Sequence, residues 1–284
     1  MSLLSSAPAR RLCGRAVWYA SAVPADVPTD RALAGLQREW DELAETDALW
    51  AVLTDPARKG GRWTVEEFLT AGETEIAAVL GRAADLGRPA RRARALDFGC
   101  GAGRLTRALS LRFDEAVGVD VSPEMVRRAR ELNADRDNVD LVVNAAPDLA
   151  FLPSQSFDLT YSNIVLQHLP SSDLAASFAR ELLRVTAPDG IAVFQAPDAI
   201  PLRFRLQPLR RAYAGLRRLG VPARALILRT PLQPMRMTPL PRARVEALVA
   251  EAGAELLAVE PDGAFGFRYY ATGAPAPPSP LPRN

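Results

Sequence analysis

The segment ALDFGCGAGRLTRAL, residues 95–109, holds the residue types best suited to chemistry in this chain of 284 residues. An apolar run is followed there by three glycines at alternate positions, Gly99, Gly101 and Gly103. A glycine-rich turn between a strand and a helix lets a ligand approach the backbone closely. Two acids flank this turn: Asp97 ends the apolar run before it, and Asp120 ends the next apolar run.

The spacing of the glycines argues against two common nucleotide loops. The dinucleotide fingerprint G-x-G-x-x-G needs a glycine at position 104, where this chain has Arg104. The Walker A loop needs a Lys-Ser/Thr pair after its last glycine, and none follows here. The carboxylate of Asp97 would repel a pyrophosphate and attract an ammonium group, and Asp120 is placed to accept hydrogen bonds from ribose hydroxyls. These residues predict a ligand with an amine, a ribose and a base, and without a phosphate.

Four segments resemble the motifs of the class I S-adenosylmethionine (SAM)-dependent methyltransferases, in the order of that family. They read LDFGCGAGRLT, GVDVSPEMVRRAR, SFDLTYSNIVLQHLP and LLRVTAPDGIAVFQ. The resemblance covers residues 93–197 and 237–273, and in detail it is most similar to type 11-like actinobacterial small-molecule methyltransferases. It implies SAM as the cofactor and S-adenosylhomocysteine (SAH) as its product.

The resemblance also implies which residues contact the cofactor. Asp97 would reach the methionine amino group, directly or through water, and Asp120 would accept the ribose hydroxyls. Many relatives have Gly-Asp-Ala where this chain has NAAPDL, so the acid that bonds the adenine amino group is missing or displaced to Asp148. The implied cofactor-binding residues are Asp97, Gly99, Cys100, Gly101, Gly103, Asp120, Val121, Met125, Asn144, Ala145, Ala146, Asp148 and Asn163.

Methyl transfer from a sulfonium is an in-line displacement, and an alcohol or phenol acceptor must also lose a proton. His168 is the only histidine, and it follows the fourth predicted strand, at the sheet edge where open α/β sheets bind ligands. It is the candidate general base, and a purely structural imidazole is the equal alternative. Gln167 is a candidate to orient the acceptor. Of the tryptophans, which are expected mainly to pack, Trp63 is the candidate substrate contact because it lies in a glycine-flanked turn.

Several other classes are disfavoured. A nucleic-acid or glutamine N-methyltransferase would carry Asn/Asp-Pro-Pro-Tyr where the chain reads SNIVLQHL, and a net charge of +2 gives no general attraction for nucleic acid. No clustered cysteines or His/carboxylate set predicts a metal site. Two cysteines fit a reducing cytoplasm, and neither a signal peptide nor an apolar run long enough to span a bilayer is predicted.

The alternation of apolar runs and helical patterns predicts the fold that would position these residues. It is typical of a Rossmann-like, doubly wound α/β sheet, with seven strands of which the last is antiparallel. Strands are expected at 94–98, 115–120, 139–143, 157–162 and 190–195, with two more in AELLAVEP and FGFRYYAT. Helices are expected near 103–112, 123–133, 172–186 and 241–252.

The chain is expected to divide into five parts. An N-terminal coil and helical cap (1–90) precedes a SAM-binding core (91–200) and a basic helical insert (201–238). A completion of the core (239–274) and a disordered tail (275–284) follow. In the cap, Thr64 with Glu67 three residues later predicts a capping box. In the insert, Pro208 is expected to separate two helices. The arginines of the insert have three open interpretations: a solvated face on a lid, attraction of an acidic or phosphate-bearing acceptor, and attachment to an anionic membrane.

The sequence thus predicts a cytoplasmic enzyme that methylates a small-molecule acceptor, at an oxygen nucleophile in natural product biosynthesis. N- or C-methyl transfer on the same fold is the first alternative. The second is a SAM-binding protein without methyl transfer, either cyclase-like or a non-catalytic partner. The acceptor could be acidic, and neither its identity nor the oligomeric state is predicted.

Overall fold

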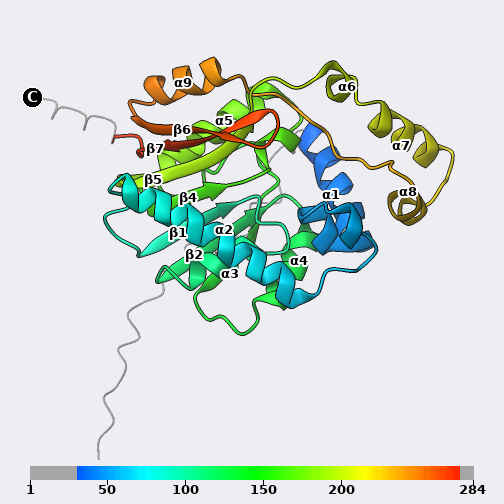
Figure 1. The fold of residues 1–284 in the computed structure, drawn as a ribbon, viewed down its shortest axis with the longest axis horizontal. Coiled ribbons are helices and arrows are strands. Elements are labelled where there is room, and N and C mark those ends of the chain that lie inside the picture. The colour runs from blue at the N-terminus through cyan, green and yellow to red at the C-terminus, as the bar shows by residue number, and fades with distance from the viewer. Residues whose placement is uncertain (1–30, 276–284) are drawn as a thin grey trace, which may run out of the picture.

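A computed structural model describes residues 31–275, built around a seven-stranded sheet of order β3-β2-β1-β4-β5-β7-β6 (Figure 1). The predicted coil before residue 31 and the predicted tail beyond residue 275 lie outside the described residues. β7 is antiparallel to β5 and β6, and the other paired strands are parallel, so the predicted fold class is confirmed. The strands are β1 (Arg94–Phe98), β2 (Glu115–Asp120), β3 (Val139–Val143), β4 (Phe157–Ser162), β5 (Thr186–Pro197), β6 (Leu256–Asp262) and β7 (Gly266–Ala271).

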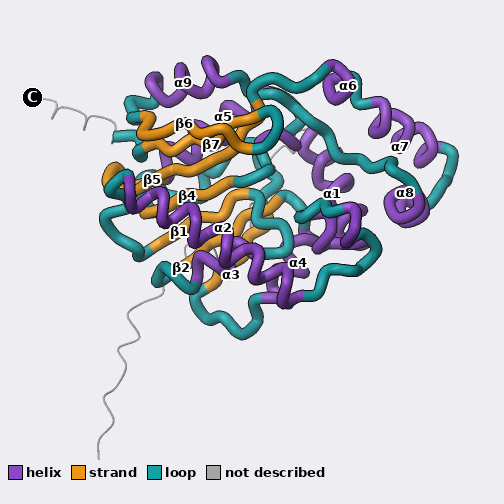
Figure 2. Tube along the Cα trace, viewed as in Figure 1, coloured by secondary structure: helices purple, strands orange, loops and turns teal. Residues whose placement is uncertain are grey.

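Helices cover both faces of the sheet because successive strand residues point to opposite sides and both sides are apolar. In β1, Ala95 packs with helices on one face and Leu96 packs with helices on the other. The first face carries α2 (Val65–Asp85) and α3 (Arg104–Ser110), and Figure 2 shows α2 crossing the viewer's side of the strands. The opposite face carries α5 (Ser172–Val185) and α9 (Arg242–Glu251).

The first four strands occupy the residues expected from the sequence, and β5 differs. It begins at Thr186 rather than at residue 190, because α5 passes into it without a connecting loop. The Thr186 hydroxyl donates to the carbonyl of Leu182 at 2.6 Å, which ends the helix and starts the strand at one residue.

The segment before the sheet folds into two long helices, α1 (Arg31–Val52) and α2, joined by a loop that holds a short 3₁₀ helix, η1 (Pro56–Arg58). α1 is kinked at Asp47, whose φ of −166° and ψ of 80° are not helical. The Asp47 carboxylate accepts the N–H groups of Gly60 and Gly61 at 2.7 and 2.8 Å, which draws the loop against α1. The capping box predicted at Thr64 is present at the start of α2.

The insert after β5 forms α6 (Leu202–Arg205), α7 (Pro208–Arg218) and α8 (Ala223–Arg229). Pro208 separates the first two helices as predicted, and α8 is a third helix that the sequence analysis did not anticipate. Figure 1 shows the three helices following one another around the side of the molecule on which α1 lies. An extended segment then returns to the sheet, where the Thr238 N–H donates to the Gln167 carbonyl at 2.7 Å.

Two shorter elements complete the loops beside the site. α4 (Pro123–Leu132) follows β2, and the 3₁₀ helix η2 (Leu166–His168) follows β4. None of the helices formed by residues 31–275 has the length and apolar character needed to cross a bilayer.

Candidate active site

A cavity of about 480 Å³ lies at the carboxyl ends of β1, β2 and β4. Its sheet half is lined by Phe98, Gly99, Gly101, Val119, Asp120, Val121 and Asn144. Its helical half is formed by α1, the loop after β4, the insert and the extended segment after α8, and its lining includes Leu33, Leu36, Trp40, Ile164, Phe204, Met235 and Met237. The two halves are continuous, so a ligand on the glycine loop and a second ligand under the helices would share one space.

The glycine loop is closely packed at its glycine positions, where a side chain would meet its neighbours. Gly99 and Gly101 have φ values of +77° and +51°, in the left-handed region that favours glycine. A Cβ at Gly99 would lie 2.3 Å from a methyl of Val165, and one at Gly101 would lie 2.6 Å from a methyl of Val52. The loop is therefore held between α1 and the loop after β4, with its backbone facing the cavity.

Asp120 ends β2 and faces the cavity with both carboxylate oxygens fixed. Oδ2 accepts the N–H of Gly101 at 2.8 Å, and Oδ1 accepts the N–H of Ser122 at 2.9 Å. Burial raises the pKa of this carboxyl, and the backbone N–H donors oppose that rise. Each oxygen keeps a lone pair for a further donor, as pairing with two neighbouring hydroxyls requires.

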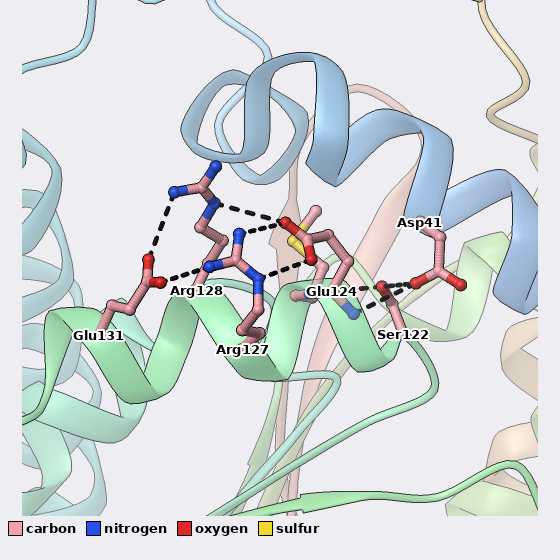
Figure 3. Close-up of polar contacts among 7 residues, drawn as sticks. Asp41, Ser122, Glu124, Arg127, Arg128 and Glu131 are labelled. Carbon is pink, nitrogen blue, oxygen red and sulfur yellow. Dashed lines mark hydrogen bonds and ion pairs between the residues drawn. The ribbon is translucent and has the colours of Figure 1, made fainter.

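The loop after Asp120 is anchored by α1 through Asp41, a residue that the sequence analysis missed (Figure 3). The Ser122 hydroxyl donates to Asp41 Oδ1 at 2.5 Å, and the Glu124 N–H donates to the same oxygen at 3.3 Å. Ser122 Oγ in turn accepts the N–H of Met125, which caps α4. α1 therefore fixes the start of α4 and, with it, the loop that carries Asp120.

Asp97 lies beneath the glycine loop and not in the cavity lining. Its carboxylate is 1% exposed and accepts the Thr106 hydroxyl at 2.6 Å. Burial raises its pKa to about 7, and the Thr106 hydroxyl and the Arg104 guanidinium oppose that rise. A buried carboxylate with a raised pKa would be stabilised in its charged form by a cation placed next to it.

Next to Asp97 is a partly buried polar cluster centred on Glu75 of α2. One oxygen of Glu75 pairs with Arg104 at 2.8 Å, and the other accepts the Tyr161 hydroxyl at 2.8 Å and the Asn163 amide at 2.7 Å. The Nε and Nη1 donors of Arg104 are buried without a hydrogen-bond partner among the described residues. Arg104, which stands where the dinucleotide fingerprint requires a glycine, is thus a buried guanidinium with two N–H donors that could bind a ligand.

His168 lies at the junction of the two halves as a neutral imidazole. Its Nδ1 is 2.7 Å from the carbonyl oxygen of Arg236, so Nδ1 carries the proton and Nε2 is the acceptor. The Gln167 amide nitrogen lies 3.2 Å from Nε2, and the Trp40 ring packs edge-on at 5.4 Å between centroids. Burial lowers the pKa of His168 to about 4, and the Arg236 charge adds to that effect.

Two residues in the helical half have strained backbones. Ile164 and Gln207 are non-glycine residues with φ values of +59° and +47°, and both line the cavity. Such a conformation is unusual for a β-branched residue, and strain of this kind concentrates at ligand sites. β4 ends at Ser162, and Asn163 and Ile164 follow it. The unusual backbone of Ile164 therefore changes the direction of the chain just before Gln167 and His168.

Two acids of α1 bind the insert. Glu39 pairs with Arg210 of α7 and with Arg236 of the extended segment, the latter at 2.8 Å. Glu42 accepts Arg217 at 2.5 Å and the Tyr213 hydroxyl at 2.6 Å. These contacts join α1 to the insert over the helical half of the cavity.

We expect Glu39→Gln to loosen the insert, because one carboxylate serves two partly buried guanidinium groups. The free energy of unfolding should fall by about 1–3 kcal/mol, and trypsin should cleave within residues 201–238 faster than in the unmodified chain. Glu45→Gln is the matched control, since Glu45 is an exposed acid on the same helix. Equal cleavage of both variants would show that Glu39 does not hold the insert.

The structure brings together seven of the residues predicted for the site and places the others outside the cavity lining. The seven are Gly99, Gly101, Asp120, Val121, Asn144, Gln167 and His168. The others are Asp97, Cys100, Gly103, Met125, Ala145, Ala146, Asp148, Asn163 and Trp63. Cys100 is buried with its pKa raised well above the usual value, and the Trp63 indole N–H donates to the Leu53 carbonyl at 3.1 Å. Within residues 31–275, no group of three or more His, Cys, Asp or Glu side chains is arranged to hold a metal.

Comparison with known proteins identifies the core. Residues 96–194 match a family model described as a methyltransferase domain. The chain is 38% identical over 122 residues to 2-methyl-6-phytyl-1,4-hydroquinone methyltransferase of Synechocystis, covering 41% of this chain and 37% of that protein. It is 36% identical over 107 residues to trans-aconitate 2-methyltransferase of Methylobacterium radiotolerans, covering 37% of this chain and 38% of that protein. The chain therefore spans less than half the length of these curated relatives.

The likeness of fold extends further along the chain than the sequence match. Magnesium protoporphyrin IX methyltransferase (ChlM) of Synechocystis PCC 6803, solved with bound SAH, superposes with a TM-score of 0.54 at 16% identity. That match covers 85% of this chain and 99% of that one. The sheet order and the superposition show the class I methyltransferase fold, and within it residues 96–194 match the methyltransferase domain.

Proposed function

We propose that the chain transfers the methyl group of SAM to an oxygen atom of an apolar small-molecule acceptor in natural product biosynthesis. The observation that carries the proposal is the continuity of the cavity. Its sheet half presents the glycine loop and Asp120, and its helical half is mostly apolar, with His168 at the junction. A cofactor and an acceptor seated in these halves would meet beside the imidazole, as an in-line displacement requires.

The residues of the sheet half fit SAM. Asp120 has two fixed oxygens for the ribose hydroxyls. Asp97 and the unpartnered donors of Arg104 provide one buried group of each charge beneath the loop, which suits the zwitterionic amino-acid end. When bound, SAM supplies an electrophilic methyl group on a sulfonium. The proposed contacts of the other predicted cofactor residues follow the family resemblance.

The helical half supports an apolar acceptor that carries a polar or anionic group. Leucine, methionine and aromatic side chains form most of the lining, and Arg203, Arg210 and Arg236 are its cations. Burial of apolar area would supply most of the affinity, and a guanidinium would orient an acidic substituent. The names of similar proteins refer to a hydroquinone, to trans-aconitate and to a malonyl-carrier protein, which supports a small or carrier-borne acceptor.

We propose that His168 is the general base for a hydroxyl acceptor. The Arg236 carbonyl holds the proton on Nδ1, so Nε2 would take the hydroxyl proton, with the acceptor in place of the Gln167 N–H that contacts it here, as the oxygen–methyl bond forms and the methyl–sulfur bond breaks. The Gln167 amide near Nε2 is placed to orient the same hydroxyl.

We expect His168→Asn to lower kcat by roughly a hundredfold and to leave SAM affinity unchanged. The asparagine amide keeps a donor for the Arg236 carbonyl and lacks the Nε2 acceptor. Because burial lowers the pKa of His168 to about 4, the neutral form is present at all higher pH, so kcat of the unmodified enzyme should stay level from about pH 8 down to about pH 5. Unchanged kcat in the variant would assign His168 a structural role, and an inflection near pH 6.5 in the unmodified enzyme would contradict the lowered pKa.

The proposed function is tested by incubating the protein with SAM that carries a deuterated methyl group and with a lipid-soluble bacterial extract. The expected result is SAH together with a product that keeps the label, found by mass spectrometry. The bond to the labelled methyl then separates O- from N- and C-methylation. Calorimetric binding of SAM and SAH without any labelled product would favour a SAM-binding protein, and absence of binding would overturn the proposal.

A further inference from the structure

The charge of the insert is one-sided. Residues 199–245 contain no aspartate or glutamate, and the insert (201–238) carries nine arginines. Three of them face α1 and pair there, Arg210, Arg217 and Arg236. The other six are exposed and have no ion-pair partner among residues 31–275: Arg203, Arg205, Arg211, Arg218, Arg224 and Arg229.

The exposed side of the insert is also apolar. Seven large apolar side chains in residues 31–275 are exposed, and four of them belong to α6, α7 and the residue that follows each helix: Leu202, Leu206, Leu209 and Leu219. Leu202 and Leu219 are 65% and 81% exposed. Clustered exposed leucines mark a surface that a partner covers, since scattered ones would be distributed over the whole protein.

Helix α7 directs the two kinds of arginine to different sides, since successive residues of a helix are about 100° apart. Arg210 and Arg217, seven residues apart, point to Glu39 and Glu42 of α1, with Tyr213 buried between them. Arg211 and Arg218 follow each of these by one residue and are exposed. A solvated face would explain the outward arginines but not the exposed leucines of the same segment.

We propose that the outer surface of α6 and α7 docks on an anionic lipid bilayer. Leucine side chains enter the acyl boundary singly and need no complementary groove, and arginine stems reach past them to the headgroup phosphates. A polynucleotide would have no contact for the leucines. Figure 1 shows α6 and α7 at the outer edge of the molecule, so a flat surface can reach both helices together.

The same helices line the cavity, which connects the docking surface with the site. Arg203, Phe204 and Gln207 line its helical half, and Leu209 both lines it and is 48% exposed. Docking would therefore turn the helical half of the cavity toward the apolar phase. An apolar acceptor dissolved in the bilayer could reach His168 along this side without crossing water.

The test is cosedimentation of the full chain with vesicles of phosphatidylcholine alone and of equal parts phosphatidylcholine and phosphatidylglycerol. We expect binding to the anionic vesicles only, weakened by added salt. Each basic residue near an anionic surface contributes roughly fivefold in partition, so Arg211→Gln/Arg218→Gln should bind more than tenfold more weakly. Arg92→Gln/Arg112→Gln removes the same charge from exposed positions elsewhere and should have little effect.

The leucine contribution is tested separately with Leu202→Ser/Leu219→Ser. Its matched control is Val65→Ser/Leu111→Ser, at positions 47% and 45% exposed at the start of α2 and directly after α3. The first pair should weaken binding to anionic vesicles, and the second should not. SAM binding by calorimetry should be unchanged in all four variants, because none of these residues lines the cavity. Absence of vesicle binding, equal losses in the controls, or binding that ignores the leucines would overturn the proposal, the last pointing to a soluble anionic partner.

Discussion

Asp97→Asn should stabilise the ligand-free protein near pH 8 and should lose that advantage as the pH falls. Burial raises the pKa of Asp97 to about 7 in the folded protein, whereas the unfolded chain has an ordinary aspartate near 3.9. Above pH 7 the folded protein therefore holds a charged, desolvated carboxylate that the unfolded chain keeps in water. A difference of about three pH units corresponds to about 4 kcal/mol, which is the upper limit of the gain expected from asparagine.

The sign of the pH dependence follows from proton uptake. As the pH falls from about 7 to about 4, the folded protein binds a proton at Asp97 and the unfolded chain does not, so the penalty disappears. Buried, neutral His168 has the opposite effect between about pH 6.5 and about pH 4, because the unfolded chain binds that proton. The unmodified protein and the Asp97→Asn variant share this contribution of His168. The difference between their free energies of unfolding therefore reports on Asp97 alone.

The measurement is urea unfolding followed by tryptophan fluorescence at several pH values between about 5 and 8. Asp158→Asn is the control, since its buried carboxylate accepts the N–H groups of Ala93 and Arg94 at 2.7 and 3.0 Å. That variant should be destabilised. A gain in Asp97→Asn that does not change with pH would show that the charge of Asp97 is not what costs stability.

The same substitution should weaken SAM binding, if Asp97 faces the amino group as proposed. An ammonium beside the carboxylate favours its charged form, so SAM should bind roughly tenfold more tightly at pH 7.5 than at pH 6, and the asparagine variant should lose this dependence. Asp97 would then be a residue retained for binding at the expense of stability, as is common at sites.

The sheet half of the cavity was predictable because its determinants are local. Each of the first four strands is an apolar run bounded by turn residues, and the glycine loop needs φ values that only its own sequence can permit. Asp120 follows from its place at the end of such a run, where parallel topology brings it beside the glycine loop. The length of β5 was underestimated because Pro188, Asp189 and Gly190 are typical turn residues, whereas the structure accommodates them as an irregularity inside the strand.

The helical half was not predictable, since contacts distant in sequence define it. Glu39 meets Arg210 and Arg236 across 171 and 197 residues, and no local pattern marks either pairing. The sequence analysis preferred Trp63 to Trp40 as a substrate contact, and of these two the structure places only Trp40 in the cavity lining. The difference arises from the kink at Asp47, which draws the loop bearing Trp63 back against α1.

Asp120→Ala should abolish measurable SAM binding while the protein stays folded. Asp120 is a charged acceptor in the cavity lining with both oxygens fixed by backbone N–H groups, and its loss would remove two charge-assisted hydrogen bonds to the ribose. Bonds of that kind contribute about 1.5–3 kcal/mol each, so the affinity should fall by at least about a hundredfold. Relief from burying a carboxylate with a raised pKa should offset part of the cost of leaving the Gly101 and Ser122 N–H groups without their acceptor, so the protein should stay folded, which circular dichroism would check.

Asp41→Asn separates direct contact from support of the loop. Asp41, on α1, accepts hydrogen bonds from Ser122 and Glu124, which follow Asp120 by two and four residues (Figure 3). Asp41 itself does not line the cavity. Asparagine keeps an oxygen for both donors, so calorimetry should show only a few-fold change in SAM affinity. A large loss in Asp41→Asn with little loss in Asp120→Ala would mean that the loop shape, and not the carboxylate, binds the ribose. Unchanged affinity in Asp120→Ala, with the fold intact, would place the cofactor elsewhere and remove the basis for assigning methyl transfer to this cavity.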